Sequence, residues 1–162
     1  MYVDVTNLVH LPVKRMAAAA LLFGEDERLL IVKPWYRPHW LLPGGMVERD
    51  ESPRQACARE AREELGLDIA PQRLLCVDYT TATDEASESL QFVFWAGRLD
   101  ASQCETIQLQ ADELTEWRLV TPTEGHALLA PRLTKRLPAC LHALTTGVTL
   151  YLEDGVPVDV SL

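Results

Sequence analysis

Residues 45–67 of this 162-residue chain read GMVERDESPRQACAREAREELGL, and this stretch decides the local fold. Ser52 can cap a helix, a proline follows at the first helical position, and Gln55 completes a Ser-x-x-Gln capping box. Gly66 stands where a helix would end, because glycine readily adopts the left-handed conformation of a C-terminal cap. The stretch therefore predicts a helix over 53–65.

Three acidic side chains share one face of this predicted helix. At about 100° per residue, Glu60, Glu63 and Glu64 fall within an arc of about 100°. The opposite face is apolar and carries Ala58, Ala61 and Leu65. Like charges at the spacing of Glu60 and Glu64 repel, and a hard cation such as Mg²⁺ or Mn²⁺, which takes oxygen ligands, would relieve that repulsion. The alternative interpretation is a solvated acidic face paired with Arg59 and Arg62.

The residues just before this stretch predict a strand that follows a loop. Residues 40–45, WLLPGG, end in two glycines, which let the backbone approach a ligand closely. Gly44 is therefore a candidate substrate-binding residue. In the preceding loop, Arg37 is the preferred candidate for binding a phosphate. Trp35 and Tyr36 either stack on a base or pack within the loop.

The rest of the chain alternates strand-like runs with helical patterns. We expect strands over 16–23, 28–32, 73–79, 89–99 and 114–120, a helix start at 121–124 and a helix over 131–146. An Asp-Gly pair predicts a terminal hairpin over about 148–158. No linker or repeat divides the sequence, so we expect one domain over 1–162.

The stretch from Gly45 to Leu67 resembles the signature of the Nudix hydrolase family. Its defined positions are all matched, namely Gly45, Glu51, Arg59, Glu60, Ala61, Glu63, Glu64, Gly66 and Leu67. The resemblance implies an α/β fold, an α/β/α sandwich with a mixed sheet and a catalytic helix at about 53–65. It also implies a pyrophosphohydrolase that uses Mg²⁺ or Mn²⁺ to cleave a nucleoside diphosphate linked to another moiety.

The resemblance also assigns metal ligands by position. Glu60 and Glu64 are the expected principal ligands of the metal, and Glu63 is either a third ligand or the general base. The carbonyl of Gly45 is expected to face the metal, which suits a position where a side chain would obstruct.

Two further expectations concern the geometry of catalysis. Arg59 is expected to pair with Glu51 and to hold the catalytic helix against its loop. The general base comes either from the signature, as Glu63, or from a later loop, where Glu113 is the candidate for a base or an extra ligand.

Composition narrows the class of partner. With 24 acidic and 15 basic residues the formal net charge is −9, the wrong sign for binding long nucleic acids. No segment approaches the roughly 20 apolar residues of a membrane span. The apolar run 16–23 after Lys14 and Arg15 is too short for a signal peptide. The four cysteines have no zinc-ligand spacing, so we expect free, mostly buried thiols in a reducing, cytoplasmic compartment.

The substrate is expected to be a small nucleotide delivered on a metal. Markers of relatives that act on ADP-ribose, diadenosine polyphosphates or NADH are absent, which favours a nucleoside triphosphate or a nucleotide sugar. The alternative hypothesis is a non-catalytic Nudix-fold module that senses a nucleotide or binds a partner. The terminal hairpin either covers an edge strand or forms a dimer contact, and a homodimer is slightly favoured.

Overall fold

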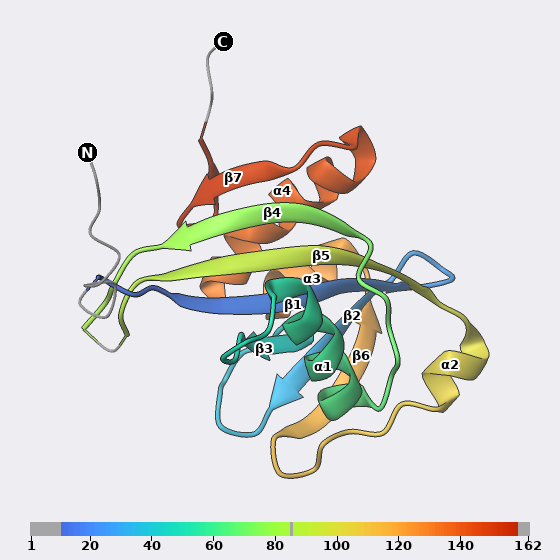
Figure 1. Ribbon diagram of the computed structural model, residues 1–162. Helices are drawn as coiled ribbons and strands as arrows, with labels where there is room; N and C mark the ends of the chain where they lie inside the picture. Colours follow the sequence, from blue (N-terminus) through green and yellow to red (C-terminus); the bar gives the residue numbers. More distant parts are fainter. Residues whose placement is uncertain (1–10, 85, 159–162) are drawn as a thin grey trace.

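A mixed β-sheet with helices on both faces forms the centre of the molecule (Figure 1). The computed structural model describes residues 11–84 and 86–158. Its strands are β1 (Arg15–Gly24), β2 (Leu29–Pro34), β3 (Gly44–Met46), β4 (Arg73–Thr80), β5 (Ser89–Leu99), β6 (Leu114–Val120), β7 (Leu150–Glu153) and β8 (Val156–Pro157). Its helices are α1 (Pro53–Leu65), α2 (Ala101–Glu105), α3 (Pro122–Leu128) and α4 (Pro131–Thr146).

The strand order is β6-β2-β1-β5-β4-β7-β8, and β3 pairs with β1 off this path. β1 runs parallel to β5 and β4 runs parallel to β7, whereas the other neighbours are antiparallel. One end of β1 pairs with β2 at Phe23, and Ala17–Ala19 pair with β3. The short strand β3 is therefore placed beside one half of β1, where α1 also packs.

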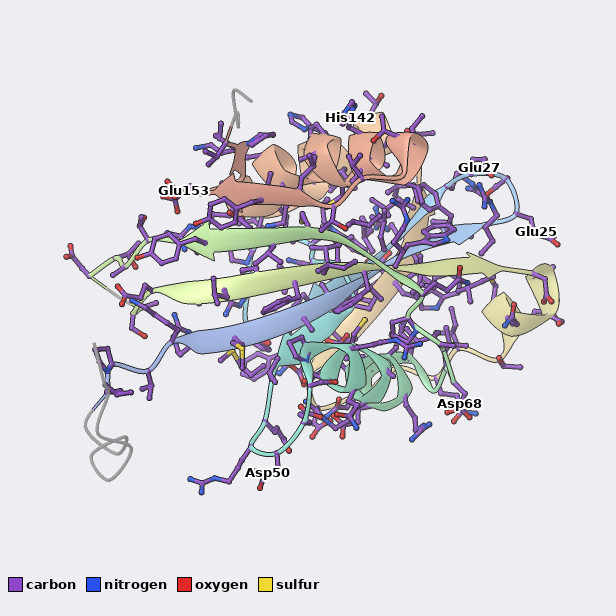
Figure 2. The ribbon with its side chains drawn as sticks, turned by 45° about the horizontal axis from the view of Figure 1, so that its top comes forward. Glu25, Glu27, Asp50, Asp68, His142 and Glu153 are labelled. Atoms are coloured by element: carbon purple, nitrogen blue, oxygen red, sulfur yellow. The ribbon has the colours of Figure 1, made fainter. Side chains whose placement is uncertain are left out.

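Alternation along β1 builds two separate cores, because successive side chains of a strand point to opposite faces. On the α1 face, one core includes Ala18, Ala20, Leu22, Leu30, Ala56 and Leu65. On the α4 face, the other includes Leu21, Phe23, Ile31, Leu75, Leu137 and Cys140. Figure 2 shows Asp50 and Asp68, which flank α1, on one side of the sheet and His142 of α4 on the other. The expected α/β/α sandwich with a mixed sheet is confirmed.

Helix α1 has the bounds that its sequence predicts. Ser52 accepts a hydrogen bond from the backbone of Gln55, whose side chain accepts one from the backbone of Ser52, and this closes the capping box. Gly66 ends the helix with a left-handed φ of 69°. These signals lie within the helix and its flanks, so they do not depend on the rest of the fold.

The apolar face predicted for α1 is confirmed at Ala61 and Leu65 and is wrong at Ala58. The buried residues of the helix are Ala56, Cys57, Ala61, Glu64 and Leu65. Ala58 is only half-buried, although we expected it on the apolar face. Glu64 instead lies on the buried face, because α1 packs against β3, where the backbone N–H of Gly44 donates a hydrogen bond to its carboxylate.

Three other expectations need correction. Residues 40–42 do not form a strand: Trp40 and Leu41 make isolated bridges, and the strand follows as Gly44–Met46. The short helix α2 was not foreseen, although Asp100 and Gln103 form its capping box. The terminal hairpin is present with shorter strands than expected, β7 and β8.

A buried ion pair fastens the terminal hairpin to the sheet. Asp78 on β4 accepts a hydrogen bond from Arg136 Nε at 2.7 Å and one from the backbone N–H of Gly155 at 3.0 Å. Both charged side chains are almost wholly buried. Asp154 in the same turn accepts two hydrogen bonds from Thr81. Because its charges are paired and its acceptors satisfied, this contact avoids the cost of an isolated buried charge.

All four cysteines are free, and three of them, Cys57, Cys76 and Cys140, are buried, as expected. Over the ranges 11–84 and 86–158, no helix is long and apolar enough to cross a membrane.

Candidate active site

Two glutamates of α1, Glu60 and Glu64, lie against β3. A Cβ atom added to Gly45 would lie 2.3 Å from Glu60 Oε1, closer than real contacts allow. The backbone N–H of Gly44 donates a hydrogen bond of 2.8 Å to Glu64 Oε2. The two glycines therefore serve different purposes: Gly45 leaves space for one carboxylate, and Gly44 donates to the other.

The backbone conformation at position 44 also requires glycine. Its φ is +148°, a conformation that residues with a Cβ rarely adopt, and an added Cβ would lie 2.2 Å from the carbonyl oxygen of Ala18. The pairing of β3 with β1 thus requires glycine here. The predicted role of Gly44 in substrate binding stays a prediction.

Arg59 contacts three carboxylates of the acidic cluster, which we define as Glu51, Glu60, Glu63 and Glu64. Its Nη2 donates to Glu51 Oε1 at 2.8 Å and its Nε donates to Glu51 Oε2 at 3.2 Å, so the expected pair is present. Its Nη1 donates to Glu60 Oε1 at 2.9 Å and to Glu63 Oε2 at 2.8 Å. Nη2 also donates to the carbonyl oxygen of Met46 on β3. One guanidinium therefore joins the loop before α1, three carboxylates and β3.

Burial and charge shift the protonation equilibria of this cluster. Burial raises the pKa of Glu64 to about 8, and the charges of Glu60 and Glu113 add to the rise while the Gly44 N–H opposes it. Burial also raises the pKa of Glu60, opposed by Arg59. The Arg59 guanidinium lowers the pKa of Glu51. The carboxylates facing β3 are thus costly to keep charged without an added cation.

The donor set fits a hard divalent cation, which prefers carboxylate and carbonyl oxygens. Glu60, Glu63 and Glu64 supply carboxylates, and the absence of a side chain on Gly45 keeps that backbone accessible to the cluster. Within the described ranges, no three acidic, histidine or cysteine side chains already stand close enough to hold a metal ion. Arg59 engages Glu60 and Glu63 instead, so these side chains would have to turn from the guanidinium to an ion.

Glu113 joins this cluster from the loop before β6. Its charge contributes to the raised pKa of both Glu60 and Glu64, which places it within electrostatic reach of them. The hydroxyl of Tyr36 donates a hydrogen bond of 3.0 Å to Glu113 Oε1. The sequence singled out both residues but gave no sign of this contact, which joins positions 77 residues apart.

Arg37, the expected phosphate-binding residue, is exposed in the loop after β2. Its guanidinium lies 5.6 Å from the centre of the Tyr36 ring, and its carbonyl oxygen accepts a hydrogen bond from Lys33 Nζ. Its role in binding phosphate stays a prediction.

A comparison with protein-family models matches residues 13–142 to the NUDIX domain. The chain belongs to the Nudix family. The match extends from the residues before β1 almost to the end of α4, and it confirms the family that the sequence predicted. The terminal hairpin lies outside the matched residues.

Two curated relatives show what this Nudix chain is similar to. It is 35% identical over 118 residues to the 8-oxo-dGDP phosphatase NUDT18 of Homo sapiens, across 68% of this chain and 35% of that protein. It is 46% identical over 61 residues to diphosphoinositol polyphosphate phosphohydrolase 2 of Rattus norvegicus, across 36% of this chain and 34% of that protein. The matches thus span about a third of the length of each relative.

Two solved structures share the fold. The MutT protein from Methanosarcina mazei Go1 superposes with a TM-score of 0.70 at 21% identity, over 82% of this chain and 96% of that one. A UDP-X diphosphatase superposes with a TM-score of 0.71 at 21% identity, over 92% of this chain and 72% of that one.

Proposed function

We propose that this Nudix chain is a metal-dependent pyrophosphohydrolase that cleaves a phosphoanhydride bond in a small nucleotide. One observation carries the proposal: Glu60 and Glu64 of α1 lie against a strand whose two glycines leave space for one carboxylate and donate a hydrogen bond to the other, and Arg59 joins Glu63 to Glu60. Like charges at this spacing are unfavourable in a helix that has only a structural role. A divalent cation bound among the carboxylates would offset their mutual repulsion.

The proposed ligands are Glu60, Glu64 and Glu63, with the Gly45 carbonyl as a further oxygen. A bound Mg²⁺ or Mn²⁺ would neutralise charge on the non-bridging phosphate oxygens and lower the pKa of a coordinated water. Glu64 is fixed for this task by the Gly44 N–H, which orients its carboxylate toward β3. Arg59, through Glu51, holds the start of α1 against its loop and so fixes the spacing between the ligands.

Two carboxylates are candidates for the general base, which must lie within hydrogen-bond reach of the attacking water. Glu63 is half-exposed, and its carboxylate accepts a hydrogen bond from Arg59 Nη1. Glu113 makes no ion pair among those found in the described chain, and the Tyr36 hydroxyl orients it by a single hydrogen bond. Both can accept a proton, and the matched amide variants E63Q and E113Q distinguish them.

The proposed substrates are a nucleoside triphosphate or a nucleotide sugar. The curated relative named for 8-oxo-dGDP and the solved UDP-X diphosphatase support a nucleoside diphosphate group as the common element. The net charge of −9 argues against long nucleic acids. Arg37 is proposed to bind a phosphate, since its exposed side chain comes from the loop that contacts Glu113 through Tyr36.

We also propose a homodimer and a reducing, cytoplasmic location. Exposed apolar side chains on the terminal hairpin, Tyr151 and Val156, support a contact at that sheet edge, and the four free cysteines support a reducing compartment. Light scattering on the purified protein measures the first directly.

The deciding experiment is a panel of nucleoside diphosphates, nucleoside triphosphates and nucleotide sugars, assayed for orthophosphate and pyrophosphate release. Turnover is expected with Mg²⁺ or Mn²⁺ and is expected to vanish in excess chelator. Full activity in chelator would refute the metal assignment. Tight nucleotide binding without turnover of any substrate would instead identify a binding module.

A further inference from the structure

Two large aromatic side chains stand exposed beside the acidic cluster. Trp35 is 66% exposed and Tyr36 is 47% exposed, in the loop after β2. Each ring has a large apolar area, and two adjacent exposed rings form a patch of the kind that marks ligand-binding or partner-binding surfaces. Their ring centroids lie 5.7 Å apart with the planes nearly perpendicular, an edge-to-face pair.

This pair is held rigidly in place. The backbone N–H of Trp35 donates to the carbonyl oxygen of Glu113 at 3.2 Å, and its indole Nε1 donates to the carbonyl oxygen of Asp112 at 2.8 Å. The Tyr36 hydroxyl donates to the Glu113 carboxylate. Lys33 Nζ donates to the carbonyl oxygen of Arg37, which closes the loop behind the pair. The rings therefore lose little freedom when a ligand binds.

The same contacts connect the pair to the proposed reaction site. Glu113 carries the hydrogen bond from Tyr36, and its charge acts on Glu60 and Glu64 across the site. A nucleotide whose phosphates lie among these carboxylates on a metal would have its base only a sugar away. Arg37, whose guanidinium lies over the Tyr36 ring, adds positive charge on the loop that carries the rings.

We propose that the exposed face of Trp35 is the stacking surface for the base of the nucleotide substrate, with Tyr36 and Arg37 supporting the ring. The inference rests on the proposed function, since it assigns a base-binding surface to that same site. It names a contact that selects nucleotides over base-free polyphosphates.

The hydrogen bonds also fix what this surface can distinguish. The indole N–H is the only donor of the Trp35 side chain, and Asp112 already accepts it. Trp35 therefore offers the base a π face and no hydrogen-bond donor to its edge. Every nucleobase has such a face, so stacking tolerates different bases. We expect purines to bind somewhat better than pyrimidines because they are larger, and adenine and guanine to bind alike.

The test measures binding separately from turnover, by calorimetry in the presence of Mg²⁺. The ligands are the α,β-methylene analogue of ADP, which resists cleavage between its phosphates, and methylenediphosphonate, which has the same phosphates and no base. W35A is expected to weaken the analogue about 5- to 150-fold and to leave methylenediphosphonate within about two-fold. H142A is the matched control: His142 is an exposed ring on α4, on the other side of the sheet from α1 (Figure 2), and this variant is expected to change neither affinity.

The variant W35F distinguishes loss of the aromatic ring from disruption of the loop. It keeps an aromatic face, so it is expected to retain most of the analogue affinity, and to lose the part of the tryptophan fluorescence that the base quenches in the wild-type protein. Equal weakening of both ligands by W35A would overturn the proposal, because it would make the loop a support for the phosphate site. An unchanged analogue affinity in W35A would overturn it as well.

The two proposals fail differently. A wild-type protein that binds the analogue more tightly than methylenediphosphonate, but hydrolyses nothing in the nucleotide panel, refutes the proposed enzyme and keeps the stacking surface. A wild-type protein that hydrolyses nucleotides, but binds both ligands equally, refutes the stacking surface alone.

Discussion

Adding one methyl group at Gly45 should lower the activity of the protein while leaving its free energy of unfolding almost unchanged. In G45A the new Cβ would lie 2.3 Å from Glu60 Oε1, where ordinary contacts begin at 3.4 Å, so this carboxylate must move by at least about 1.1 Å. Misplacement by about 1 Å costs on the order of 100-fold in rate. We therefore expect kcat/KM to fall about 100-fold and the Mg²⁺ concentration for half-maximal activity to rise.

The fold of G45A should survive. The clashing atoms belong to the far end of a flexible side chain, and Gly45 has no positive φ. The free energy of unfolding should therefore change by less than about 1 kcal/mol.

The adjacent variant G44A provides the contrast. Its Cβ would lie 2.2 Å from the Ala18 carbonyl oxygen and 2.6 Å from Ala19 Cα, both backbone atoms, at a φ of +148°. Backbone strain costs about 1–3 kcal/mol before the displacement of β3 from β1 is added. We expect a loss of about 3 kcal/mol or more, or at least about 6 °C in Tm. Thermal unfolding and Mg²⁺ titrations of both variants measure the difference. A G45A protein with wild-type rate and Mg²⁺ requirement would refute the placement of Glu60 against β3.

Three further outcomes follow from the site and the core. E64Q should lower turnover at least about 100-fold by removing a proposed ligand, while thermal stability stays equal or rises, because burial disfavours the charged carboxylate; an active E64Q would remove Glu64 from the ligand set. At saturating Mg²⁺, whichever of E63Q and E113Q loses about 10²- to 10⁴-fold in kcat marks the general base, and equal, small losses would exclude both Glu63 and Glu113. R136M should cost about 3–5 kcal/mol in urea unfolding at unchanged kcat, since Asp78 would be left buried without its partner; a loss below about 1 kcal/mol would show that water or another group compensates Asp78.

The parts of the structure that local chemistry determines could be predicted. The bounds of α1 follow from a capping box at Ser52 and a glycine at 66, which act within a few residues of the helix ends. Helix α2 carries the same kind of signal in Asp100 and Gln103, and a search for Asp-x-x-Gln as well as Ser-x-x-Gln would have found it. The Arg59–Glu51 pair was predicted from the family signature and is confirmed.

The burial of Glu64 could not be predicted from the sequence of α1 alone. Side-chain periodicity shows which residues share a face, but it does not show that a backbone N–H of the neighbouring strand will bind a carboxylate on the buried side. Glu64 was expected opposite the apolar face and lies on the buried side for this reason. The Tyr36–Glu113 hydrogen bond depends on β2 pairing with β6, a long-range register that no local pattern determines.

Arg59 makes the acidic cluster a place of competition between two cations. Its guanidinium already pairs with Glu60 and Glu63, so a divalent ion that takes those carboxylates must displace a tethered charge that never leaves the protein. The apparent metal affinity is therefore a difference between two interactions rather than the strength of one. Glu51 and the Met46 carbonyl can retain Arg59 after the exchange, so the displaced charge remains beside the reaction site. This arrangement sets a threshold concentration of metal below which the carboxylates stay paired with the protein's own arginine.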